Sequence, residues 1–163
     1  DHALYPALWK NRKTFPMEVH RLSSPRLSML KIQSGQPTSG AVSGITYNAA
    51  FSSKDRLRAE VYIDVWDLAL NKAIYDTLLA QKTEIEAETG ELAWERLDQR
   101  RACRIALVRT NANIDDVSQQ GETMRTWLVQ ALLTLKKSFG PRLVGAVESA
   151  RQIVGEKLVE STK

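Results

Sequence analysis

Residues 57–110, preceded by Arg56, decide the fold. They read LRAEVYID, then VWDLALNKAIYDTLLAQKTEIEAETG, then ELAWERLDQRRACRIALVRT. In the first piece, apolar residues at positions 57, 59, 61 and 63 alternate with charged residues and a tyrosine. An alternation with a period of two predicts a β-strand that has one apolar and one polar face.

The second piece changes to helical spacing, with apolar residues at positions 70, 74, 78 and 85 on one side. Gly90 predicts the end of this helix, because glycine adopts the left-handed conformation that commonly caps a helix. The third piece returns to strand-like composition over residues 92–98 and 102–110. Residues 57–110 therefore predict the order strand, helix, strand, strand.

The rest of the chain supplies further elements on both sides. Before residue 57 we expect a helix over residues 3–13, a connection over 14–27, and strands over 27–33 and from Gly44 onward. After residue 110, Asp115 or Asp116 is the expected N-cap of a helix. The pair Gly140-Pro141 is expected to end that helix and open a last one, because proline suits the first position of a helix.

These elements predict the α+β class: a mainly antiparallel sheet of about five strands, with helices packed on one face. The order is α-β-β-β-α-β-β-α-α. A chain of 163 residues fits a single domain over residues 1–163. Its parts are residues 1–23 (N-terminal helix and connection), 24–110 (strand and helix core) and 111–163 (C-terminal helical pair). Because the chain begins at Asp1, we expect it to be the C-terminal segment of a longer protein.

Composition excludes several classes of protein. The chain is 43% hydrophobic and 26% charged, and it has no apolar run near the roughly 20 residues that span a bilayer. Its first residues lack the apolar core and cleavage site of a secretory signal. The single cysteine, Cys103, excludes an internal disulfide and lies in an apolar strand pattern, where a buried core residue is expected. We therefore expect a cytoplasmic protein without a membrane partner.

The net charge of +4 is spread unevenly. Residues 1–56 carry +5, residues 57–100 carry −5 and residues 101–163 carry +4. Basic ends around an acidic middle are typical of a protein with an anionic partner. The alternative is that these charges only keep the surface solvated.

The sequence contains no recognisable catalytic motif. His2 and His20 have no partner at metal-ligand spacing, and the loop SGQPTSGAVSG fits neither a nucleophile elbow nor a phosphate-binding loop. The carboxylates Glu60, Asp64 and Glu95 lie on predicted strands, but the lysine that a metal-dependent nuclease needs is missing after Glu95. We predict no catalytic residue, no metal and no cofactor; a variant metal nuclease that uses these three carboxylates is the least favoured alternative.

Nucleic-acid binding has better support. Basic residues cluster around the last predicted strand and at the junction of the last two predicted helices, where they could contact phosphates. Tyr47, Tyr62 and Trp94 are candidates for stacking on bases, with the core as the alternative place for each. The predicted nucleic-acid-binding residues are Arg100, Arg101, Arg104, Lys136 and Lys137.

The central stretch also resembles a known family, the bacterial and archaeal domain of unknown function forty-two sixty-eight. The resemblance covers about residues 24–143, and its most specific part is the pairing of IEAETG with LAWERL. A longer QSGQPTSGAVSG replaces the family's short glycine turn. The other matching pieces are RLRAEVYID, NKAIYDTLLAQKTEIEAETG, LAWERLDQRRACRIALVR and TWLVQALLTLKKSFGPRL, with a looser match in SPRLSMLKIQSG and GITYNAAFS.

The resemblance implies the kind of protein in which this domain occurs. It implies no catalytic residues. Domains of this family often end proteins whose N-terminal part resembles restriction-type nucleases, and they occur among bacterial defence and DNA-processing genes. The first hypothesis is therefore a non-catalytic accessory domain that helps such a protein engage DNA or RNA. The alternative is a protein-interaction or dimerisation module without nucleic-acid contact, which acts through a sheet edge or the last helix.

Overall fold

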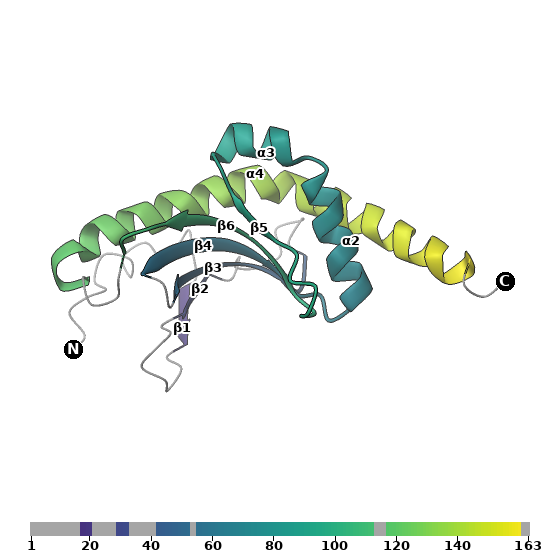
Figure 1. Cartoon of the computed structure of the whole chain (residues 1–163), viewed down its shortest axis with the longest axis horizontal. Helices are drawn as coiled ribbons and strands as arrows, with labels where there is room; N and C mark the ends of the chain where they lie inside the picture. The colour runs from purple at the N-terminus through teal and green to yellow at the C-terminus, as the bar shows by residue number, and fades with distance from the viewer. Residues whose placement is uncertain (1–16, 21–28, 33–41, 53–54, 113–116, 161–163) are drawn as a thin grey trace.

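The computed structural model describes residues 17–20, 29–32, 42–52, 55–112 and 117–160 (Figure 1). Six strands form one sheet in the order β1-β2-β3-β4-β6-β5, and every neighbouring pair is antiparallel. The predicted α+β class is confirmed, with one strand more than expected. The strands are β1 (Met17–His20), β2 (Met29–Ile32), β3 (Ile45–Ser52), β4 (Arg56–Ile63), β5 (Ala93–Glu95) and β6 (Cys103–Arg109).

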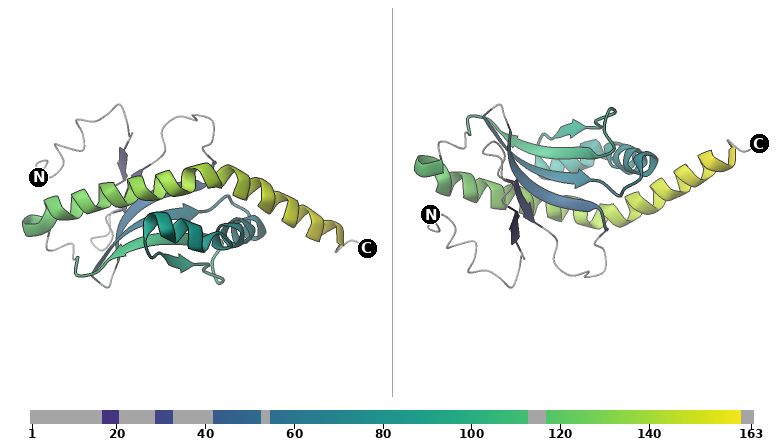
Figure 2. Two further views of the ribbon diagram at one scale, coloured as in Figure 1. Left: turned by 90° about the horizontal axis from the view of Figure 1, so that it is seen from above. Right: turned by 90° about the horizontal axis from the view of Figure 1, so that it is seen from below.

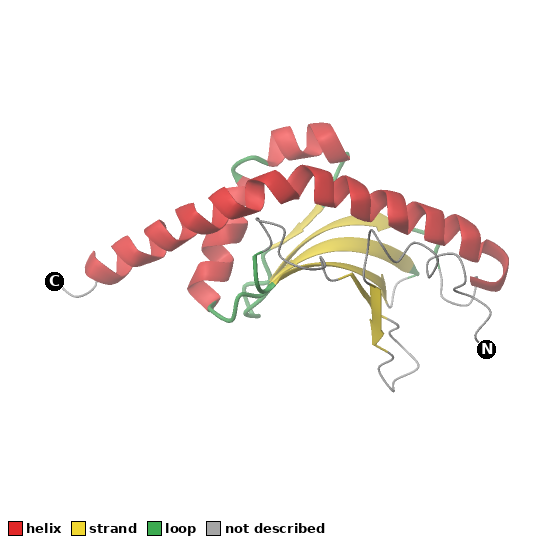
Figure 3. Cartoon of the chain, turned by 180° about the vertical axis from the view of Figure 1, so that it is seen from behind, coloured by secondary structure: helices red, strands yellow, loops and turns green. Residues whose placement is uncertain are grey.

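Three helices cover one face of this sheet: α2 (Leu68–Leu79), α3 (Lys82–Thr89) and α4 (Val117–Glu160). Figure 3 shows α4 crossing the whole sheet and continuing beyond it toward the C-terminus. Asp67 caps α2, because its Oδ1 accepts a hydrogen bond of 2.8 Å from the backbone N–H of Leu70. None of the helices in the described part of the chain has the length and apolar character needed to cross a membrane.

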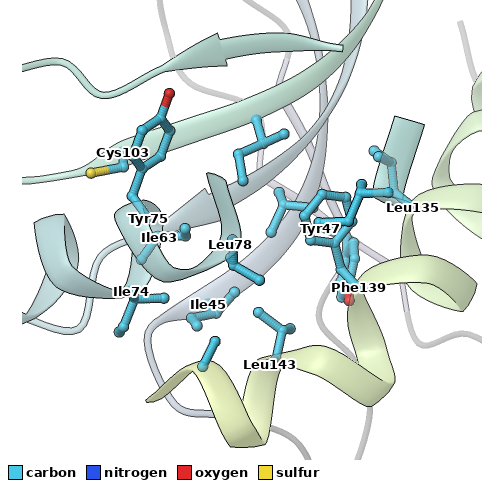
Figure 4. Packing of buried hydrophobic residues seen from close by; sticks show 14 of the residues in the cluster. Ile45, Tyr47, Ile63, Ile74, Tyr75, Leu78, Cys103, Leu135, Phe139 and Leu143 are labelled. Carbon is cyan, nitrogen blue, oxygen red and sulfur yellow. The ribbon is translucent and has the colours of Figure 1, made fainter. Parts of the chain in front are cut away.

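The alternation of β4 places its apolar residues toward the helices, as the sequence predicts. Val61 pairs with Tyr47 of β3 and with Ile105 of β6, so the three side chains form one buried row under the helices. Phe139 and Leu135 of α4 pack on this side of the sheet (Figure 4). The opposite face of β4 carries the polar residues.

Two expectations about short segments need correction. Residues 14–27, expected to be a connection, contain β1, which pairs with β2 at the edge of the sheet. The single helix expected before Gly90 is two helices, because the helical conformation is interrupted at Ala80 and Gln81 between α2 and α3. Gly90 does end α3 with a positive φ of 82°. The helix expected over residues 3–13 lies outside the described residues.

The prediction that Gly140-Pro141 separates two helices is wrong, because α4 is continuous through Pro141. The apolar side of α4 explains this continuity: Phe139 before the proline and Leu143 after it are both buried in the same core. Packing on both sides therefore outweighs the loss of one backbone hydrogen bond. Figure 2 shows α4 bending near its middle, as expected for a helix that contains a proline.

Candidate nucleic-acid interface

Two loops lie together at one end of the sheet. One joins β4 to α2 and carries Asp64 and Trp66; the other joins β5 to β6 and carries Arg100 and Arg101. The Arg101 guanidinium binds both carboxylate oxygens of Asp64, at 2.7 and 2.8 Å. It also lies 4.3 Å from the centre of the Trp66 ring. We call Trp66 and Arg101 together the platform.

Trp66 is the most exposed large apolar residue of the described chain, with 80% of its surface accessible. Its φ of 66° is in the left-handed region, which costs a bulky residue free energy and persists only where neighbouring contacts impose it. The contact here is a hydrogen bond of 2.8 Å from the backbone N–H of Val65 to Oδ1 of the buried Asn71. The Asn71 side chain of α2 thus fixes the backbone next to Trp66, whose own side chain lies in solvent.

Asn71 and its neighbour Lys72 also fix the second loop; we call this pair the clasp. Asn71 Nδ2 donates to the carbonyl oxygen of Arg101 at 3.3 Å. Lys72 is 8% exposed, and its Nζ lies 2.6–3.2 Å from four backbone carbonyl oxygens, those of Arg96, Leu97, Arg100 and Ala102. A buried ammonium group needs such acceptors to offset its lost hydration. The clasp therefore positions both halves of the platform.

Gly44 contacts the loop between β4 and α2 through its backbone. Its carbonyl oxygen accepts a hydrogen bond of 2.7 Å from the N–H of Asp64, and its φ is 88°. A Cβ at this position would lie 2.6 Å from the carbonyl oxygen of Asp64. Only glycine fits here without moving the loop that carries Trp66.

The structure brings together only two of the five predicted phosphate-binding residues, the exposed Arg100 and Arg101. Arg104 of β6 is partly buried and pairs with Glu60 at 3.0 Å and Glu95 at 2.9 Å. Charge reversal of Arg104 would place a third carboxylate beside these two, so it would perturb the sheet as well as any binding. Lys136 and Lys137 are exposed on a different element, α4.

The aromatic candidates from the sequence are mostly in or near the core. Tyr47 is buried, and burial raises the pKa of its phenol to about 12. The Trp94 ring packs edge-on against Tyr75 with 6.0 Å between ring centres, and Tyr62 is half-buried. The sequence reasoning missed Trp66. Its position directly before the N-cap Asp67 was the available signal, because a residue there precedes the helix and can point away from the core.

The carboxylates of the variant-nuclease alternative all face arginines. Glu60 is only 2% exposed and lies 2.6 Å from Arg58 Nε as well as close to Arg104. The hydrogen bonds from Arg101 lower the pKa of Asp64 below its usual range. Among the described residues, no group of three or more histidine, cysteine or acidic side chains is arranged to hold a metal ion. These carboxylates form ion pairs on the polar side of the sheet.

Comparison with known proteins gives one match. Residues 36–143 match the family model described as Domain of unknown function (DUF4268). No curated protein and no solved structure matches the chain. The matched segment begins ahead of β3 and ends within α4, so it includes the platform, the clasp and four of the six strands. Because it spans well over half of the sequence, the chain belongs to the DUF4268 family.

Proposed function

We propose that this chain is a non-catalytic accessory domain that helps a nuclease-like or defence-related bacterial protein engage nucleic acid, with the platform as its contact for an unpaired base. The observation that carries the proposal is the exposed Trp66 ring stacked with Arg101. Proteins that bind single strands use aromatic rings and guanidinium planes in this way, because every base has a π-face.

The ion pairs of Arg101 and Arg104 indicate whether base stacking or phosphate contacts contribute more to binding. Asp64 offsets the charge of Arg101, and Glu60 and Glu95 offset that of Arg104, so neither arginine is a strong phosphate ligand. Arg100 lies next to the platform and is the residue we assign to a phosphate there, with Lys136 and Lys137 on α4 as more remote contacts. We therefore expect stacking to contribute more than charge, and single strands to bind better than duplexes.

Fluorescence anisotropy with labelled single- and double-stranded DNA and RNA, at two salt concentrations, tests this proposal. Trp66→Ala should weaken single-strand binding roughly 5- to 150-fold, because one base-aromatic stack contributes about 1–3 kcal/mol. Leu68→Ala is the matched control, since Leu68 is an exposed apolar residue two positions further along the chain. Equal affinity of Trp66→Ala and the unmodified chain, or no binding at low salt, would refute the proposal.

A second candidate function, protein–protein interaction, also has a specific observation in its favour. A groove of about 760 Å³ lies between α2 and the C-terminal part of α4. Exposed apolar residues beside a groove are typical of surfaces that bind another protein. Ile153 and Leu158 line this groove and are 39% and 64% exposed.

A further inference from the structure

Asp64 is the one carboxylate in direct contact with the platform. It precedes Trp66 by two residues in the loop between β4 and α2, and it binds Arg101 of the loop between β5 and β6. Nε of Arg101 donates to Oδ1 of Asp64, and Nη2 donates to Oδ2. A protein that uses an exposed arginine only for its charge gains nothing from such a counter-ion, so the role of Asp64 needs an explanation.

Stability does not supply that explanation. The Arg101 side chain is 41% exposed and that of Asp64 is 24% exposed. Ion pairs in contact with solvent contribute little to stability, because water screens the charges and ordering two side chains costs entropy. The loop of Arg101 is already fixed by the clasp, through hydrogen bonds to its backbone. The main effect of Asp64 is therefore on what Arg101 can bind.

The geometry of the pair determines what remains of Arg101 for a ligand. An arginine binds phosphate with the same paired N–H groups that it uses for a carboxylate. Asp64 occupies the edge formed by Nε and Nη2, and its charge cancels that of the guanidinium. The flat face of the guanidinium still lies over the Trp66 ring, which is 80% exposed. The platform thus offers a π surface to a ligand and little positive charge.

Asp64 is also held firmly enough to resist displacement by a phosphate. The hydrogen bonds from Arg101 lower its pKa, and those from the backbone N–H of Trp66 and the side chain of Asn71 add to this effect, while burial opposes it. The carboxylate is therefore ionised near neutral pH. A phosphate that replaced it on Arg101 would bring a second negative charge beside it. Asp64 thus competes with phosphate for the guanidinium.

We propose that Asp64 is the specificity-determining residue of the platform: it withholds Arg101 from phosphates, so that the site selects an unpaired base over the sugar-phosphate backbone. Single strands and duplexes both have phosphates, so contacts to phosphate do not distinguish them. An unpaired base is available for stacking only in the single strand. The inference rests on the proposed function, because it concerns the same site.

The salt dependence of binding tests this role, because a purely structural role of Asp64 would not steepen it. Asp64→Asn keeps the shape of the side chain and releases Arg101 for a phosphate. The slope of log affinity against log salt should steepen by about 0.9 for a DNA duplex and by about 0.7 for a single strand. Between about 200 and 50 mM salt, the duplex should gain about threefold more affinity than it gains with the unmodified chain. Anisotropy titrations measure both slopes.

Two further variants separate release of the guanidinium from a general change of charge. Asp98→Asn makes the same change of charge on the loop of Arg101, but Arg96 stays bound to both oxygens of Asp76, at 2.9 and 3.0 Å, so no arginine is released. Its slopes should be those of the unmodified chain. The double variant Asp64→Asn, Arg101→Gln removes both charges of the pair. It loses the guanidinium and therefore some single-strand affinity, but its slopes should also be unchanged.

The outcomes distinguish this inference from the proposed function. Circular dichroism first checks that each variant folds. Steeper slopes for Asp64→Asn alone support the inference. Unchanged slopes for this variant overturn it, and so does an equal steepening with Asp98→Asn. A double variant with shallower slopes also overturns it, because Arg101 would then already bind a phosphate in the unmodified chain. If Trp66→Ala weakens binding in any of these cases, only the role of Asp64 is refuted; an absence of binding by every chain refutes both.

Discussion

The buried ammonium group of Lys72 joins α2 to the loop between β5 and β6. It lies within 3.2 Å of four carbonyl oxygens of one loop. Lys72→Met keeps most of the stem but removes the charge and its donors. Because hydrogen bonds to a charged group each contribute about 1.5–3 kcal/mol, we expect the free energy of unfolding to fall by about 2–4 kcal/mol.

Urea denaturation measures this change, and Lys82→Met is its control. Lys82 is exposed and has one long ion pair with Glu86 within α3, at 3.8 Å. Such a pair contributes at most about 0.5 kcal/mol, so the control should be close to the unmodified chain. If Lys72→Met were equally mild, the four carbonyl contacts would have no net stabilising effect.

A second residue-scale prediction concerns acid. The hydrogen bonds from Arg142 lower the pKa of Glu88 from 4.5 to about 2. The unfolded chain therefore takes up this proton first as the pH falls. The contribution of Glu88 to stability is fully present above about pH 4.5 and is lost progressively toward pH 2. Glu88→Gln should flatten the dependence of stability on pH within this window.

Urea midpoints at several pH values between 2 and 7 measure the flattening. Arg142→Gln removes the same ion pair from the other side, so it should flatten the profile in the same way, and the double variant should add nothing further. If Glu88→Gln kept the full pH dependence of stability of the unmodified chain, that dependence would come from other carboxylates.

At this scale the sequence predicts burial better than pairing. The alternation in β4 correctly assigned Val61 to the core and Glu60 to the polar face. It could not show that Arg101 pairs with Asp64, because the two are 37 residues apart and meet only through the register of β4 with β6. Some arginines that the sequence predicts to bind phosphates, such as Arg101, therefore form ion pairs within the fold.

Among the elements, the turn before β3 carries a sharp prediction. Gly44→Ala should lower the free energy of unfolding by about 2–3 kcal/mol, since φ is 88° and the new Cβ would collide with the backbone of Asp64 and Val65. Gly145→Ala is the control: Gly145 lies inside α4 with open space around it, so alanine should stabilise the helix by about 0.5–1 kcal/mol. Thermal unfolding of both variants measures the contrast. A neutral Gly44→Ala would mean that the loop shifts without cost.

In two places the helices do not follow the boundaries that the local sequence predicts. Gly140-Pro141 has the composition of a helix boundary, yet α4 continues because buried residues on both sides of it share one core. Conversely, the residues around Ala80 are good helix formers but contain a break, and Leu78 before it and Ile85 after it are buried in one core. In both cases tertiary packing decides, and a single sequence does not contain that information in local form.

For the whole molecule, the ion pairs predict how binding depends on salt. Five phosphate contacts to a single strand would give a slope near −3.5 in a plot of log affinity against log salt, because each contributes about −0.7. With Arg101 and Arg104 compensated by carboxylates, at most three of the five remain, so we expect a slope no steeper than about −2. Anisotropy titrations from 50 to 300 mM salt measure it, and a slope near −3.5 would contradict the assigned pairing.

The sequence was sufficient for the fold class and the family, while the candidate site came mainly from the structure. The class follows from periodicity, which each strand and helix carries locally. The platform depends on three segments, residues 64–66, 71–72 and 96–102, that converge only after the sheet closes. Trp66 stands out only once its exposure is known.

The Lys72 ammonium also bears on the solution conditions that the loop tolerates. Four carbonyl oxygens around one positive charge resemble a potassium-channel filter, in which backbone carbonyl oxygens replace the water around the ion. Here the ion is tethered to α2, so it cannot be exchanged for another, chelated or diluted away. The charge that holds residues 96–102 is therefore part of the chain and does not exchange with cations in solution.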